Sequence, residues 1–136
     1  MTVSNRRREL VKERDGFRCM AEGPHCTRFV DLTMQHRTNK GMGGSKLLDG
    51  FENLITLCGL CNTLLEQDPE WAEIGRQRGW KLFSWEDRLR VAVWVSWASE
   101  WRLLDGRGDW VRAAGRDPLE VLSPSVRAVL EGGVLS

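Results

Sequence analysis

The sequence predicts a small α+β domain, because short apolar strands and capped helices are both present and neither type dominates. The 136 residues are 41% hydrophobic and 29% charged, which is an ordinary balance for one globular domain with a modest core. Four cysteines in two groups indicate that a metal staples this core. We therefore treat residues 1–136 as a single domain.

The first elements are predicted from capping and turn residues. Residues 4–14 are expected to form a helix, with Ser4 or Asn5 as its cap, and Asp15-Gly16 is a turn signal that ends it. Residues 28–36 are rich in β-branched and apolar side chains, which predicts a strand.

The middle of the chain continues with a loop, a strand and two helices. Residues 38–50 contain four glycines, which predicts a flexible loop. A second short strand is expected over 52–57, followed by a short helix over 58–67. Residues 69–78 begin with proline and are followed by glycine, the asymmetry typical of a helix.

Residues 80–136 form a C-terminal extension in which most of the tryptophans are found. Strands are expected over 91–95, 101–104 and 109–113, and a helix over 117–131. Tryptophans on strands can stack on nucleic-acid bases, but a hydrophobic core is the simpler interpretation.

The four cysteines predict structural zinc. Cys58 and Cys61 form a Cys-x-x-Cys pair, and no βαβ pattern surrounds it that would indicate thioredoxin-like redox chemistry. Cys19 and Cys26 form the second pair, with a spacing wider than usual that a knuckle with glycine and proline can span. His25 is an alternative ligand beside Cys26.

Charge is spread unevenly along a chain whose net charge is only +1. Residues 1–50 contain ten Lys/Arg and six Asp/Glu, whereas residues 51–136 contain ten and thirteen. A basic N-terminal half fits a polyanionic partner, although a solvated helix is the alternative explanation. The chain has neither an apolar signal segment at its start nor a membrane-length apolar run, so we expect it in the cytoplasm.

Three features of residues 13–68 occur together: Gln35-His36-Arg37, Asn53-Leu-Ile-Thr-Leu-Cys-Gly-Leu-Cys-Asn62 and the two cysteine pairs. In this combination the segment resembles the HNH endonuclease family. The resemblance implies a ββα-metal core with a zinc knuckle, flanked here by the N-terminal helix and the Trp-rich small sheet and helix. The layout is also similar to that of short HNH proteins of phages and prophages, for which the location would be the host cytoplasm.

The resemblance implies a role for each matching residue. His36 would be the general base that activates water, and Asn53 would hold the loop and orient the histidine. Gln35 stands where the family usually has a stronger metal ligand. We therefore expect Gln35, Asn62 and Glu66 to bind a catalytic Mg²⁺ or Mn²⁺, because Asn62 and Glu66 share one helix face. Glu66 as a plain exposed residue is the alternative, and Asp31 is a further candidate ligand.

Basic side chains near the predicted site are candidates for binding phosphate groups. Arg37, Lys40 and Lys46 belong to the loop after the first strand, whose glycines expose backbone N–H groups. The N-terminal helix adds a second basic group, which consists of Arg6, Arg7 and Arg8.

Two functions are consistent with these residues. The first is an HNH-like endonuclease that cleaves double-stranded DNA. The second is a catalytically weak, zinc-stapled nucleic-acid-binding module that assists another nuclease or a packaging machine, and Gln35 is the residue that keeps this alternative open. RNA is a third substrate to consider, because metal chemistry does not by itself select the sugar. Cutting both strands would require a homodimer or two successive nicks.

Overall fold

The computed structural model describes residues 3–39 and 46–115, with only the backbone of Lys46 and Leu47. The expected helix over 117–131, three of the four glycines of the 38–50 loop and Lys40 lie outside the described residues, as does the Lys46 side chain. Within the described part, no helix is long and apolar enough to cross a membrane.

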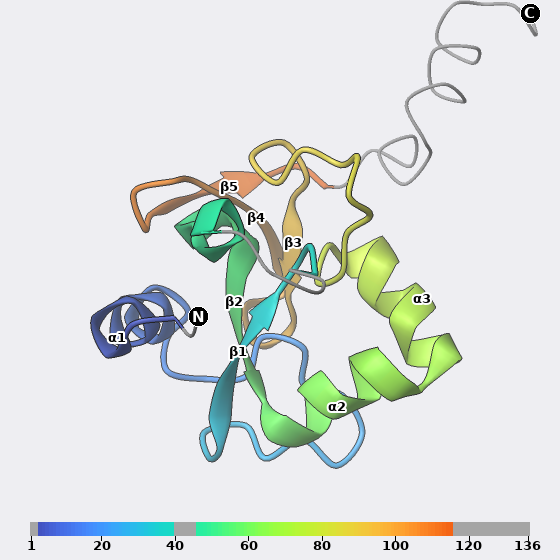
Figure 1. Ribbon diagram of the computed structural model, residues 1–136. Coiled ribbons are helices and arrows are strands. Elements are labelled where there is room, and N and C mark those ends of the chain that lie inside the picture. Colours follow the sequence, from blue (N-terminus) through green and yellow to red (C-terminus); the bar gives the residue numbers. More distant parts are fainter. Residues whose placement is uncertain (1–2, 40–45, 116–136) are drawn as a thin grey trace, which may run out of the picture.

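Over the described residues the architecture is mixed α+β, as predicted, with three helices and two small antiparallel sheets (Figure 1). The first sheet pairs β1 (Leu32–His36) with β2 (Leu54–Cys58). The second sheet has the order β3-β4-β5, and its strands are Val93–Val95, Glu100–Leu104 and Trp110–Ala113. The helices are α1 (Asn5–Arg14), α2 (Gly59–Gln67) and α3 (Pro69–Arg78).

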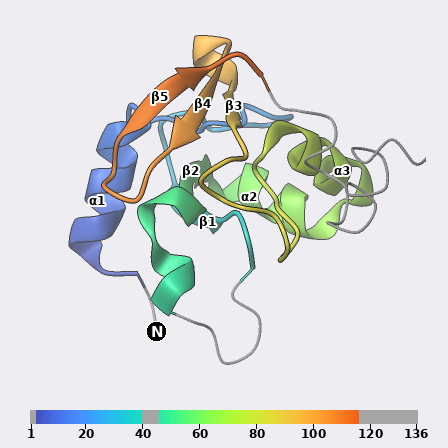
Figure 2. The ribbon, with the colours of Figure 1, turned by 90° about the horizontal axis from the view of Figure 1, so that it is seen from above.

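Figures 1 and 2 show α1 on one side of the β1–β2 sheet and α2 and α3 on the other. In the same part of the chain, three short 3₁₀ helices lie between strands: η1 (Lys46–Asp49), η2 (Phe51–Asn53) and η3 (Ser96–Ala98). Because η1 and η2 directly precede β2, the end of the long loop is structured right up to the strand that pairs with β1.

The helix ends follow the predicted local signals. The Ser4 hydroxyl accepts a hydrogen bond from the Arg7 N–H, and the Asp68 carboxylate accepts from the first N–H groups of α3. Gly79 ends α3 with a φ of 79°, and a Cβ there would lie 2.0 Å from the Ala92 carbonyl oxygen. Glycine is therefore required at this position both for its backbone conformation and for space.

The first strand is shorter in the structure than the predicted range, 28–36. Arg28 and Asp31 adopt left-handed backbone conformations with φ near 59° and 55°. The Thr27 hydroxyl donates to the Val30 carbonyl at 2.5 Å, which closes a turn. These residues form a turn between the Cys19–Cys26 knuckle and the strand, and only Leu32–His36 pair with β2.

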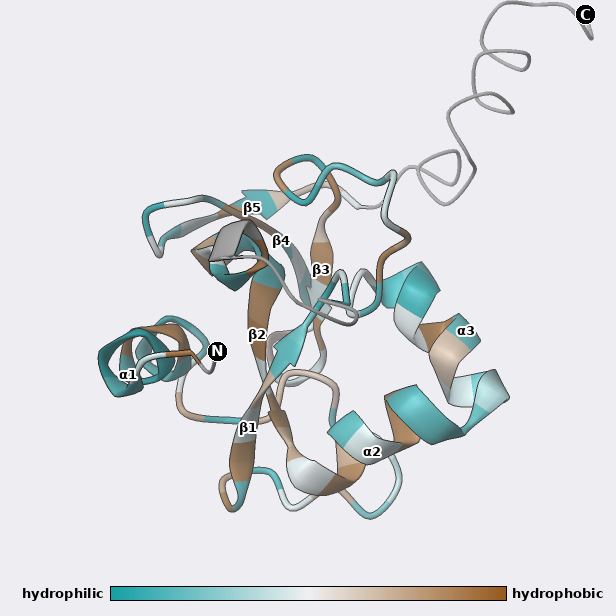
Figure 3. Cartoon of the chain, in the orientation of Figure 1, coloured by the Kyte–Doolittle hydropathy of each residue, from teal (hydrophilic) through white to brown (hydrophobic). Residues whose placement is uncertain are grey.

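The main hydrophobic core joins the two sheets. All five residues of β2 are buried, and Figure 3 shows hydrophobic residues prominent on β2 and β3. Val93 and Val95 pack in one buried cluster with Ile55, Leu57 and Trp80. Four further tryptophans pack against this cluster, and the three that belong to the C-terminal extension help to complete the core: Trp71, Trp94, Trp97 and Trp110. Trp85 and Trp101 are not among them, and Trp85 is 46% exposed.

Helix α1 is hydrophilic over most of its surface (Figure 3), and it is held to β2 by polar contacts. The Arg14 guanidinium donates to the Phe51 and Leu54 carbonyls, and it also pairs with the neighbouring Asp15 carboxylate at 2.7 Å. The Asp15 carboxylate in turn accepts from the Thr56 N–H at 2.9 Å. The turn that the sequence predicts at Asp15 therefore also anchors the helix to the sheet.

Candidate functional site

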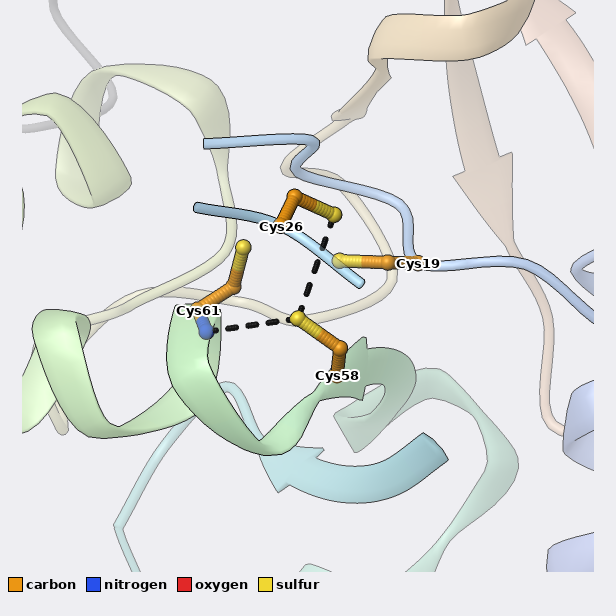
Figure 4. Close-up of side chains that lie close together, drawn as sticks. All are labelled: Cys19, Cys26, Cys58 and Cys61. Carbon is orange, nitrogen blue, oxygen red and sulfur yellow. Dashed lines mark hydrogen bonds between the residues drawn. The ribbon is translucent and has the colours of Figure 1, made fainter. Parts of the chain in front are cut away.

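The four cysteine sulfurs meet at one end of the first sheet (Figure 4). Cys19 and Cys26 come from the knuckle after α1, Cys58 ends β2, and Cys61 lies in the first turn of α2. All four Sγ atoms lie within 4.8 Å of one another, and those of Cys26 and Cys58 are 3.8 Å apart. The predicted cysteine pairs are thus brought together, close enough to bind one metal ion.

The size of the sulfur cluster is that of a tetrahedral site. Zinc–thiolate bonds of ~2.3 Å place the sulfurs of a regular tetrahedron ~3.8 Å apart. The Cys26–Cys58 separation equals this edge, and no separation exceeds it by more than about 1 Å. The residues present are therefore compatible with structural zinc. The other proposed ligand, His25, is exposed and is not part of the cluster.

Backbone N–H groups point at three of the sulfurs. Gly23 donates to the Cys61 Sγ at 3.3 Å, Arg28 donates to the Cys26 Sγ at 3.3 Å, and Cys61 donates to the Cys58 Sγ at 3.4 Å. Such bonds stabilise thiolate charge and fix the direction of each ligand. The wide Cys-x₆-Cys segment supplies one of these donors, Gly23, and it includes a left-handed residue at His25.

The sulfurs also perturb one another's protonation. A hydrogen bond from the Cys61 side chain lowers the pKa of the Cys19 thiol to about 5, and the same bond raises the pKa of Cys61. Burial raises the pKa of Cys26 to about 11. The cluster therefore favours a thiolate that shares a neighbour's proton, and a dication in its centre would take the place of such protons.

His36 ends β1, at the opposite end of the sheet from the cysteines. In the strand register His36 faces Leu54, whereas Leu32 faces Cys58, so roughly 13 Å of strand separates the two centres. The His36 Nε2 lies 2.8 Å from the Asp49 Oδ1. The two side chains are 22% and 14% exposed, so the imidazole keeps access to solvent while its partner is nearly buried. Asp49 is not among the site residues predicted from the sequence, although it is the only acidic residue in the 38–50 loop.

Asn53 is fully buried, and its side chain holds both ends of the 38–50 loop. Its Oδ1 accepts from the Thr38 N–H at 2.7 Å, and its Nδ2 donates to the Thr38 and Leu48 carbonyls at 3.1 and 2.7 Å. Its backbone carbonyl accepts from the Arg37 N–H at 2.8 Å. This geometry matches the loop-holding role expected for Asn53.

The three expected metal ligands have separate partners. The Asn62 Nδ2 donates to the Thr33 Oγ1 at 2.9 Å, while Glu66 pairs with Lys81 at 3.4 Å. Gln35 is 3% exposed, and within the described residues its Nε2 has no hydrogen-bond partner. No described contact joins these three side chains to one another or to His36, so their shared metal site stays a prediction.

Arg37 differs from the sequence prediction. Its side chain is fully buried, and its guanidinium donates to four backbone carbonyls at 2.5–3.0 Å, those of Glu52, Gly79, Arg88 and Val91. A buried guanidinium in such a cage ties the segment after α3 to the end of β1. We therefore correct the expectation that Arg37 contacts phosphate.

The basic residues of α1 divide into two groups. Arg6 and Arg8 are exposed, as phosphate binding requires. Arg7 is instead turned toward the protein, where its guanidinium donates to the Asp49 carbonyl at 2.7 Å and lies 4.5 Å from the centre of the Phe51 ring. Arg7 thus supports the segment that holds the partner of His36.

Comparisons of the chain with protein-family models, curated proteins and solved structures found no match.

Proposed function

We propose that the protein is a metal-dependent endonuclease that hydrolyses phosphodiester bonds in double-stranded DNA. In this proposal β1, β2 and α2 are the ββα core of an HNH-type site, with Zn²⁺ bound by the four cysteines. The observation that carries the proposal is the placement of His36, a partly exposed imidazole at the end of a strand with its ring anchored by Asp49. Asn53 braces the loop between them, as the resemblance to HNH enzymes implies.

The chain supplies a general base and a surface that can bind phosphate. A neutral His36 would take a proton from the attacking water, and general-base catalysis of this kind contributes roughly 10²–10⁴-fold to a rate. Arg6 and Arg8 are exposed on α1 and would bind phosphate groups away from the cleaved bond. Lys40 and Lys46 are proposed for the same purpose from the sequence alone.

A hard divalent ion fits the chemistry of the expected ligands, although only one of the three carries a charge. The Asn62 amide donates through its nitrogen, which leaves its oxygen to bind a metal one helical turn from Glu66. The Glu66–Lys81 pair is partly exposed, and such pairs contribute little to stability, so a metal can displace it. When bound, Mg²⁺ or Mn²⁺ would act as a Lewis acid on the scissile phosphate.

We expect the substitution Glu66→Gln to raise the Mg²⁺ concentration needed for half-maximal cleavage by roughly 10-fold, because it removes the only carboxylate among the expected ligands. Asp31→Asn is the matched control, because Asp31 lies in the turn directly before β1. Only its backbone carbonyl has a described hydrogen bond, from the Gly59 N–H. Titrating Mg²⁺ in a cleavage assay measures both variants. Equal shifts, or a larger shift for Asp31→Asn, would rule out Glu66 as a ligand.

The function itself is tested by incubating supercoiled plasmid with the protein and Mg²⁺, Mn²⁺ or EDTA. We expect nicking or linearisation that requires the metal and that falls at least 100-fold in His36→Ala, because the variant lacks the general base. His25→Ala is the matched control and should keep full activity, since this exposed histidine is remote from His36. Metal-dependent cleavage that survives His36→Ala would contradict the proposed mechanism. Binding of DNA without cleavage under any condition would favour the accessory module.

A further inference from the structure

We propose that Asp49 is the positioning residue of His36, holding the imidazole in one tautomer with Nδ1 free to accept a proton. The inference rests on the proposed function and deepens it by identifying a residue to which nothing in the sequence motif points. It starts from the 2.8 Å contact between the His36 Nε2 and the Asp49 Oδ1. A carboxylate can only accept here, so the Nε2 is the nitrogen that carries the hydrogen.

The backbone around Asp49 is held on both sides, so its carboxylate has a defined position. The Leu48 carbonyl accepts from the Asn53 side chain at 2.7 Å, and the Gly50 carbonyl accepts from the Asn53 N–H at 3.0 Å. Between them, the Asp49 carbonyl accepts from the Arg7 guanidinium at 2.7 Å. Helix α1 therefore contributes to the site through Arg7, and three consecutive carbonyls are fixed.

The same asparagine also fixes the chain on the His36 side. Asn53 exchanges two side-chain hydrogen bonds with the Thr38 backbone and accepts from the Arg37 N–H. One fully buried residue thus sets the distance between the segment that carries the imidazole and the segment that carries the carboxylate. Supporting contacts of this kind keep a reactive side chain in its productive geometry.

The consequence for catalysis follows from the two ring nitrogens. With Nε2–H donated to Asp49, the lone pair lies on Nδ1, on the other side of the ring from the carboxylate. The proton of the attacking water would move to Nδ1, and the imidazolium so formed would be stabilised by the Asp49 charge, while Asp49 itself stays ionised. A ring in the other tautomer would present Nδ1–H to the water and could not act as a base, and a ring turned over would present a carbon.

The first test measures steady-state cleavage by Asp49→Ala and Asp49→Asn. We expect kcat to fall roughly 10–100-fold in Asp49→Ala and less in Asp49→Asn, whose amide oxygen can still accept. The KM for DNA and the Mg²⁺ dependence should change less than about twofold. Asp109→Asn, an exposed acid on the turn between β4 and β5, is the matched control and should match the parent. Unchanged kcat in Asp49→Ala, or a loss restored by excess Mg²⁺, would overturn the proposal.

The second test does not depend on cleavage. The chain has two histidines, so in a His25→Gln background the ¹⁵N ring signals of His36 are observed alone. We expect the neutral ring to carry its proton on Nε2 in the parent and to become a mixture of tautomers in Asp49→Ala. An unchanged tautomer would overturn the positioning role even if His36→Ala proves His36 essential. If the parent cleaves no DNA but the tautomer shifts, the proposed function fails and the positioning role of Asp49 stands.

Discussion

Cys58→Ser is expected to abolish metal binding and with it most of the folded structure. Cys58 joins β2 to α2 and is a fully buried member of the sulfur cluster. Structural zinc sites in small domains contribute about 10–16 kcal/mol of binding free energy, whereas domains of this size are stable by only about 5–15 kcal/mol. Losing one ligand of four therefore removes a contribution as large as the whole net stability.

The measurement combines metal analysis with circular dichroism. The purified parent should contain one zinc per chain and unfold cooperatively, and Cys58→Ser should lack both properties. His25→Ala is the control, since it removes the remaining candidate ligand without touching the cluster, and it should retain its zinc. A parent that contains no metal, or that unfolds at the same temperature with and without a strong chelator, would contradict the zinc site.

Arg37→Met is expected to lower the free energy of unfolding by about 3–5 kcal/mol, through the loss of charge-assisted hydrogen bonds in the interior. Methionine has a comparable length and no donor, so it leaves the buried carbonyls of Glu52, Gly79, Arg88 and Val91 without their guanidinium partner. Each buried polar group left unsatisfied costs about 1–3 kcal/mol.

The matched control for this prediction is Arg90→Met. The Arg90 side chain is 85% exposed, and its only described ion pair, with Asp87 at 3.7 Å, lies at the surface. Such a substitution changes stability by about 0.5 kcal/mol or less. Urea denaturation of both variants measures the difference. A similar, small effect for both would mean that the Arg37 cage contributes nothing to folding, and a selective loss of DNA affinity in Arg37→Met would return this residue to the binding surface.

Arg37 also shows where sequence reasoning reached its limit. In the sequence it stands beside His36 in a glycine-rich basic loop, where a role in phosphate binding is the natural prediction. Three of its four carbonyl partners lie at residues 79–91, more than 40 positions along the chain. Nothing local indicates that this segment folds back over the end of β1, so the burial of Arg37 could not be predicted.

Asp49 was missed for a related reason. It is a single carboxylate in a loop, 13 residues after His36, and that spacing has no periodic meaning. Its contact depends on how Asn53 draws together the two ends of the loop. The one available signal was that the 38–50 loop holds no other acid.

The sequence by itself determined the α+β class, the ends of α1 and α3, and the cysteines that gather into one cluster. The helix ends depend on short-range physics, because a cap, a proline or a glycine acts on N–H and carbonyl groups within a few residues. The cysteine cluster was predictable because two cysteine pairs in a small domain are typical of a zinc site. Only the tertiary structure decided that Arg37 is buried, that Arg7 supports the Asp49 segment and that Asp49 contacts His36. Those contacts join segments that are distant in the sequence, and packing of the whole chain, which local residue preferences do not encode, sets their distances.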